Sequence, residues 1–151
     1  MSIITAVLEL PWSKPPMSMN DRMHWAQKAK LTKRIRAEAG ILACRNRLPT
    51  GLDHVTVALV YRPRDRRRRD TDNLMPVLKA LCDGLVDHGL VTDDTPQWMT
   101  KHMPRLYEPQ KGAGGAMWLE VTWEVPEAAD ERQRPAQPAP AATALDTKDH
   151  R

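Results

Sequence analysis

The fold is decided by residues 55–85, VTVALVYRPRDRRRRDTDNLMPVLKALCDGL, in which an apolar segment leads through a basic segment into a second apolar segment. The first part alternates apolar with other residues, which predicts a half-buried β-strand marked by Val55, Val57, Leu59 and Tyr61. After Asn73 the apolar residues recur mostly every three or four positions, which predicts a helix with the stripe Leu74, Val77, Leu78, Leu81 and Leu85. Pro76 is tolerated only in a first helical turn, and Gly89 suits the position just past the last turn.

The sequence on either side of this stretch predicts one more helix and three more strands. A β-branched, apolar run over residues 3–10 predicts a first strand, which Pro11 ends. Helical spacing predicts a helix over about 24–47, whose outer face is basic: Lys28, Lys30, Lys33, Arg34 and Arg36. Two further strands are expected over 97–106 and 116–125, joined through a glycine-rich turn. The order strand, helix, strand, helix, strand, strand predicts an α+β domain with a mixed β-sheet.

Length and composition predict one domain and a tail. A chain of 151 residues with 41% hydrophobic residues has room for one packed core, which we expect over residues 1–126. Residues 127–151 are mostly Ala, Pro and charged, which predicts disorder. Cys44 and Cys82 lack zinc-binding spacing and are interpreted as reduced, structural thiols. No signal-peptide pattern or run of about 18 apolar residues is present, so we expect a cytoplasmic protein with no membrane partner.

The basic segment indicates a polyanionic partner. The net charge of +4 is modest, but six of the eight residues from 62 to 69 are arginine. Guanidinium groups contact phosphates and release counterions, which gives strong binding with little sequence information. We therefore predict that this segment binds DNA through Arg62, Arg64, Arg66, Arg67, Arg68 and Arg69. A solvated loop or a basic localisation tract is the alternative that composition alone leaves open.

Two carboxylates follow the basic segment directly. Asp70 and Asp72 lie two residues apart between the predicted strand and helix, and in extended backbone their side chains point the same way. Carboxylates this close repel one another and persist as helix caps or as ligands of a hard cation. Capping by Asp72 or Asn73 explains one residue and leaves Asp70 unexplained. A second pair, Asp93 and Asp94, follows the helix, and by itself such a pair usually marks a turn.

Arginines that hold phosphates beside carboxylates that bind Mg²⁺ describe a phosphodiesterase site. The metal polarises a phosphoryl oxygen and activates water, so no protein nucleophile is required. The sequence offers no serine with a His and Asp partner pattern, and its five histidines show no metal-ligand spacing. The absence of glycine at the sixth position of the run that starts at Asp70 excludes an EF-hand loop.

Three segments resemble the signature of the RusA family of Holliday junction resolvases: RRRDTDNL at 67–74, KALCDGL at 79–85 and the aspartate pair at 93–94. The order of strands and helices around them, with Pro11-Trp12 after the first strand, agrees with that family. The resemblance implies a homodimer that binds four-way DNA junctions by their structure and nicks them using Mg²⁺, or Mn²⁺ in its place. It implies Asp70, Asp72 and Asp94 as catalytic metal ligands and Lys79 as a catalytic lysine.

Lys79 departs from the family spacing, because it follows Asn73 by six residues instead of three. In a helix the three extra residues turn the side chain by about 300° and raise it by about 4.5 Å, which leaves it near its original face, one turn on. The alternative interpretation of Lys79 is an ion pair with Asp83 at i+4.

Chain reach predicts that each active site is shared across the dimer. A helix from about Asp72 to His88 carries the chain roughly 24 Å, whereas the six steps back to Asp94 span at most about 20 Å. Asp94 is therefore expected to meet Asp70 and Asp72 of the other subunit, since a two-fold interface brings residue i to j and j to i.

Two other classes of function remain open at this stage. One is a catalytically silent protein that binds branched DNA, although Asp70 and Asp72 would repel phosphates unless a cation intervened. The other is a metal-dependent nuclease that acts on flaps or RNA.

The tryptophans could stack on unpaired bases at a junction, but large aromatic residues at strand and helix positions are mostly core residues, as expected for Trp98, Trp118 and Trp123. Trp25 is the expected exception, because it follows a proline-rich loop and precedes the basic helix face, where it could be inserted at the branch point.

Overall fold

The computed structural model describes residues 1–126 and 135, which are built around a five-stranded mixed sheet. The strands are β1 (Ser2–Glu9), β2 (Val55–Arg62), β3 (Met99–Lys101), β4 (Arg105–Leu106) and β5 (Ala116–Val125). The sheet order is β1-β5-β2-β3, and β4 pairs with β2 beyond β3. β5 is antiparallel to β1 and β2, whereas β3 and β4 run parallel to β2. The predicted α+β class with a mixed sheet is confirmed, and the predicted tail at 127–151 lies outside the described residues.

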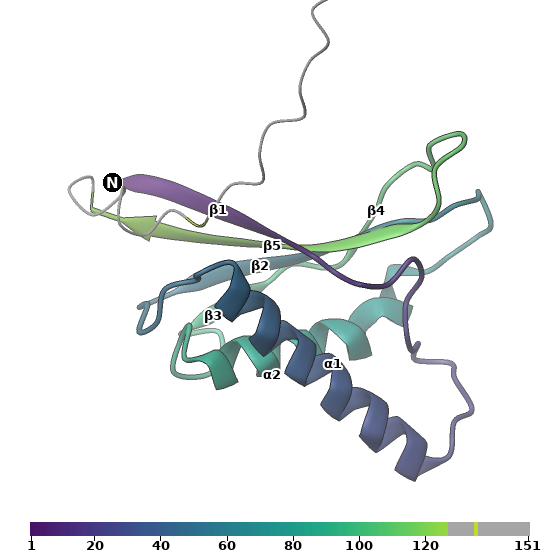
Figure 1. The fold of residues 1–151 in the computed structure, drawn as a ribbon, viewed down its shortest axis with the longest axis horizontal. Coiled ribbons are helices and arrows are strands. Elements are labelled where there is room, and N and C mark those ends of the chain that lie inside the picture. The colour runs from purple at the N-terminus through teal and green to yellow at the C-terminus, as the bar shows by residue number, and fades with distance from the viewer. Residues whose placement is uncertain (127–134, 136–151) are drawn as a thin grey trace, which may run out of the picture.

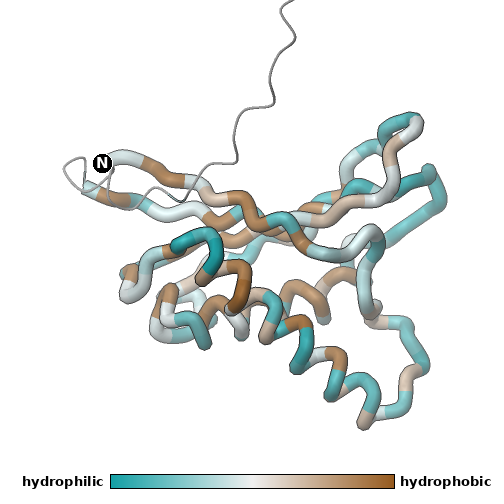
Figure 2. Tube along the Cα trace, viewed as in Figure 1, coloured by the Kyte–Doolittle hydropathy of each residue, from teal (hydrophilic) through white to brown (hydrophobic). Residues whose placement is uncertain are grey.

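Both helices cover the same face of the sheet (Figure 1). They are α1 (Trp25–Arg45) and α2 (Met75–His88), and a short 3₁₀ helix, η1 (Thr71–Leu74), leads directly into α2. Every second residue of β1 is buried, which is the pattern of a strand with one face on the core. Figure 2 shows the apolar residues gathered in the strands and along the helices, and hydrophilic residues in the loop after β2. These elements match the predicted ones to within one or two residues at most ends.

Gly84 sets how closely the two helices approach. A Cβ atom at this position would lie 2.1 Å from the Arg36 carbonyl oxygen and 2.7 Å from the Ala39 Cβ, so only glycine fits. One helical turn further on, the Arg36 guanidinium donates to both carboxylate oxygens of Asp87, at 2.5 and 2.7 Å. Arg36 was expected on a free basic face, but it is held between the helices.

The prediction of a single strand over 97–106 is wrong in one respect. The segment forms two short strands, β3 and β4, on either side of an irregular stretch that contains the buried Pro104. Proline cannot donate to a sheet ladder, so the strand is interrupted there and resumes for two residues. Both pieces pair with β2, which leaves this side of the sheet as an edge.

The cysteines are both free, as predicted, but only Cys82 is buried. Burial raises the pKa of the Cys82 thiol to about 12, which keeps it protonated and inert. Cys44 lies on the exposed side of α1 and is not a core residue. No helix within residues 1–126 is both long and apolar enough to cross a membrane.

Candidate nucleic-acid and metal site

The loop between β2 and η1 holds the predicted DNA-binding arginines in two different environments. Four of them project from the surface: Arg64, Arg66, Arg67 and Arg68. Their ion pairs are long or absent, at 3.8 Å for Arg64, 3.9 Å for Arg66 and 3.5 Å for Arg67, and Arg68 has none within the described residues. Surface pairs of this kind contribute little, so these four side chains are available to phosphates.

Arg69 and Arg62 point inward instead. The Arg69 guanidinium donates to the Asp65 carboxylate at 2.6 Å and to the carbonyl oxygens of Asp65 and Arg67 at 2.9 Å each. It also lies over the Tyr61 ring, 5.9 Å from the ring centre. Arg62 is half-buried, and its Nε atom has no hydrogen-bond partner. Arg69 is thus tied to the fold and Arg62 is half-buried, whereas the prediction is that all six arginines bind DNA.

Asp65 organises the arginine loop, and sequence reasoning did not single it out. Its carboxylate accepts from the Arg69 guanidinium and from the Arg67 backbone N–H. These two hydrogen bonds hold the pKa of Asp65 below its ordinary value. The only sequence signal is that Asp65 is the one acidic residue within the basic run.

Asp70 and Asp72 lie at the start of the η1–α2 helical segment with free carboxylates. Asp70 has extended backbone (φ −101°, ψ 134°), but Asp72 lies within the 3₁₀ helix, so the expectation of an extended pair holds for Asp70 alone. The residue at the cap position of α2 is Leu74, and no side chain caps that helix. Capping therefore does not explain Asp72 or Asn73. Within the described residues neither carboxylate has a hydrogen bond or ion pair.

A cleft of about 310 Å³ opens beside Asp70. Its other wall is the proline-rich loop before α1, which contributes Lys14, Ser18 and Asp21. The Asn20 amide donates to the Asn73 side-chain oxygen at 3.0 Å and so fastens this loop to the start of the helical segment. The proline-rich loop therefore lies against the start of the helical segment that carries Asp70 and Asp72.

Asp94 contacts Lys79 and a second lysine, Lys101, which the sequence did not indicate. Lys79 Nζ lies 2.5 Å and Lys101 Nζ 2.8 Å from Asp94 Oδ2. Lys79 also pairs with Asp83 at 3.1 Å, which is the predicted alternative, so both interactions are present. No periodicity marks Lys101, because β3 is too short to show one.

The two lysines determine the charge state of Asp94. Hydrogen bonds from Lys101 and then Lys79 hold the pKa of Asp94 far below its ordinary value, so this carboxylate is ionised throughout the physiological range. The same contact with Asp94 raises the pKa of Lys79, which stays cationic. Both lysines bind Oδ2, and neither of them binds Oδ1.

Asp94 does not join Asp70 and Asp72 in one chain. It binds the end of the Lys79 side chain, and the Lys79 backbone lies roughly 14 Å along the helical segment from that of Asp70. Accordingly, no three His, Cys, Asp or Glu side chains within residues 1–126 are placed to hold one metal ion. Of Asp70 and Asp72, Asp70 lines the cleft with a free carboxylate, and Mg²⁺ is usually held by one or two carboxylates together with waters and substrate phosphates.

The tryptophans divide as expected. Trp123 is buried, and Trp98 packs against the core. Trp118 is half-buried and meets Tyr107 edge to face at 5.5 Å. Trp25 is the exposed exception, with 77% of its surface accessible.

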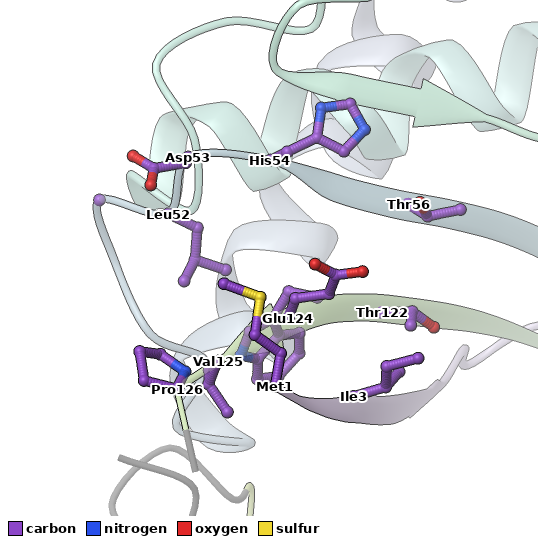
Figure 3. A pocket seen from close by; sticks show the side chains of 12 residues that line it. Met1, Ile3, Leu52, Asp53, His54, Thr56, Thr122, Glu124, Val125 and Pro126 are labelled. Carbon is purple, nitrogen blue, oxygen red and sulfur yellow. The ribbon is translucent and has the colours of Figure 1, made fainter. Parts of the chain in front are cut away.

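A second hollow, of about 650 Å³, lies at the opposite end of the sheet (Figure 3). Residues from the start of β1 and the end of β5 line it together with the segment that leads into β2. Thr56 borders this hollow and Tyr61 borders the cleft at Asp70, and five strand residues place them roughly 17 Å apart. None of the predicted site residues lines it.

Comparison with known proteins adds one relative. No protein-family model matches the chain. An uncharacterized protein of Xylella fastidiosa strain Temecula1 is 32% identical over 92 residues, which is 58% of this chain and 59% of that protein. The chain thus spans less than two thirds of the relative's length, and the relative's name attaches no activity to it.

Proposed function

We propose that this protein is a Mg²⁺-dependent endodeoxyribonuclease that resolves four-way DNA junctions, as the resemblance to RusA implies. The observation that carries the proposal is the pair of unpaired carboxylates, Asp70 and Asp72, directly after a loop with four outward arginines. Anions left free beside an expected polyanion are unfavourable unless a cation lies between them. A protein that only binds DNA has no use for this arrangement, which favours hydrolysis over silent binding.

Each group has a defined task in this proposal. Arg64, Arg66, Arg67 and Arg68 bind the phosphates and orient the strand. Asp70 and Asp72 would hold Mg²⁺, which would supply polarisation of a phosphoryl oxygen and activation of water. Lys79 stays protonated against Asp94 and places a positive charge next to the carboxylate that completes the site.

Sharing of each site across a homodimer is part of the proposal, because no three carboxylates within residues 1–126 come together to hold a metal ion. Asp94 is paired with Lys79, whose backbone lies about 14 Å along the helical segment from that of Asp70, and neither lysine binds its Oδ1. A two-fold axis brings the Asp94 of one subunit to the Asp70 and Asp72 of the other. Lys79 and Lys101 then fix the orientation of the carboxylate that each subunit contributes to its partner's site.

The decisive experiment compares substrates. The full chain is incubated with a synthetic four-way DNA junction, a linear duplex, a flap and an RNA duplex, each with Mg²⁺ and with EDTA. Symmetric nicks in the junction that need Mg²⁺ support the proposal. Cleavage of the flap or the RNA in preference to the junction, or junction binding without cleavage, would replace it with one of the other two functions.

A further inference from the structure

The exposed face at the start of α1 is not used by the site described above. Figure 1 shows α1 sloping away from the sheet toward its N-terminus. A shallow groove runs along this part of the helix, lined by Trp25, Lys28, Ala29, Thr32, Lys33 and Arg36. These positions recur at three- and four-residue intervals or their sums, so they form one continuous strip on the helix surface.

The strip is positively charged, and its lysines are unpaired. Residues 25–36 include five basic side chains and no acidic one. Within the described residues Lys28 and Lys33 have no ion-pair partner, whereas Arg36 is held by Asp87. The first turn of α1 also contains no acidic residue, so the partial positive charge of the helix N-terminus adds to that of the lysines. The strip therefore complements a polyanion.

Trp25 gives the groove a flat apolar surface. Its side chain is 77% exposed, and the centre of its ring lies 5.6 Å from the centre of the exposed His24 ring. The indole thus packs on another surface residue and not on the core. An exposed indole next to unpaired lysines offers stacking to a base and charge to the adjoining phosphates. Duplex DNA keeps its bases stacked inside, so this combination fits unpaired nucleotides.

The groove adjoins the cleft at Asp70. The Thr32 hydroxyl, which lines the groove, lies 3.8 Å from the sulfur of Met17, which lines the cleft. The loop that carries Met17 is fastened to Asn73 by Asn20. A strand that leaves the cleft would pass this loop near Thr32 and follow the groove for about two turns of α1 to reach Trp25.

We propose that the groove binds an unpaired nucleobase on Trp25 and its flanking phosphates on Lys28 and Lys33. This inference rests on the proposed function, because the bound strand is the one that the nuclease site cuts. The groove thereby selects DNA whose strands separate near the scissile phosphate, which adds a requirement that phosphate contacts alone do not impose.

The test measures binding of a fluorescent oligo-dT single strand, and of a duplex of equal length, to the full chain in EDTA. Trp25→Ala should weaken single-strand binding about 5- to 150-fold, the range for loss of one stacked base, and leave duplex binding nearly unchanged. Trp25→Phe should restore part of the loss. Ile41→Ala is the matched control, since Ile41 is also an exposed apolar residue of α1 (46%) and should change neither affinity.

The lysines have a matched control as well. Lys28→Ala should reduce both the affinity for the single strand and the salt dependence of that affinity. Lys30→Ala removes the same charge from a position about 140° around the helix from Trp25, so it should reduce both quantities less than Lys28→Ala does. Equal effects of the two lysine variants, or wild-type single-strand binding by Trp25→Ala, would overturn the inference. Competition by poly-glutamate as effective as that by oligo-dT would also overturn it, in favour of an acidic polypeptide.

Failure of this inference differs from failure of the proposed function. If the wild-type chain nicks junctions but Trp25→Ala binds oligo-dT normally, the groove assignment is wrong and the nuclease stands. If Trp25→Ala loses oligo-dT binding but the wild-type chain nicks no branched DNA, the groove binds single strands and the nuclease is wrong.

Discussion

Replacing Arg67 and Arg68 with alanine should reduce the salt dependence of junction binding by an amount that the structure sets. Both side chains are exposed, Arg68 has no partner in the described part of the chain, and Arg67 has only a 3.5 Å contact with Asp65. If each contacts one phosphate, the slope of log K against log salt falls by about 0.9 per arginine, or roughly 1.8 in total. Between 50 and 200 mM salt, the double variant should then lose roughly 12-fold less affinity than the wild type.

The assay is a fluorescence-anisotropy titration of a labelled four-way junction at several salt concentrations, in EDTA so that no cleavage occurs. Arg45→Ala with Arg47→Ala is the control, since these exposed arginines lie at the far end of α1 from the arginine loop. The control should keep the wild-type slope to within one phosphate contact. An unchanged slope in the Arg67 and Arg68 variant would mean that these side chains are solvated in the complex, and the interpretation of the loop as a phosphate contact would fail.

Four further results are expected. Asp70→Asn, Asp72→Asn and Asp94→Asn should each abolish nicking but keep junction binding, because each removes charge from a metal site; wild-type nicking by any one variant removes that residue from the site. Mixing Asp70→Asn with Asp94→Asn under conditions of proven subunit exchange should restore nicking, since sites shared between subunits leave one intact site per heterodimer. Absence of nicking by a verified heterodimer would show that the sites are not shared. Lys101→Met should slow nicking about 10- to 100-fold by releasing Asp94, with binding unchanged, and an unaltered rate makes this contact irrelevant to catalysis. Gly84→Ala should lower the free energy of unfolding by about 1–3 kcal/mol, as measured by urea denaturation, because its Cβ meets the Arg36 carbonyl; undiminished stability would mean that the helices separate at no cost.

The fold was largely predictable because its main elements carry local signals. The alternation in β2 and the leucine spacing in α2 depend on which face of each element is buried, and both are visible in the sequence. The edge segment over 97–106 is different, because its pairing with β2 is decided by what lies opposite. Pro104 was the one local clue that the strand would break.

The site was less predictable, since its contacts join distant parts of the chain. Asp70 and Asp72 stand out by their spacing beside the arginines, but the partner that fixes Asp94 does not. Lys101 reaches Asp94 because β3 pairs with β2, which brings Lys101 close to the segment that follows α2. Likewise, the division of the arginines into bound and free ones depends on where the loop folds back onto Tyr61.

Arg69 forms an ion pair with Asp65 and not with Asp70, its neighbour in the sequence. Arg69 immediately precedes Asp70 and is the cation best placed by sequence to neutralise it. The Arg69 guanidinium instead donates to the Asp65 carboxylate and to two backbone carbonyl oxygens, and no ion pair joins it to Asp70, although both residues line the same cleft. These contacts fix the position of the guanidinium beside Asp65 without using all of its N–H donors. One acidic residue within the basic run therefore leaves the proposed metal ligands free, although cationic side chains surround them in the sequence.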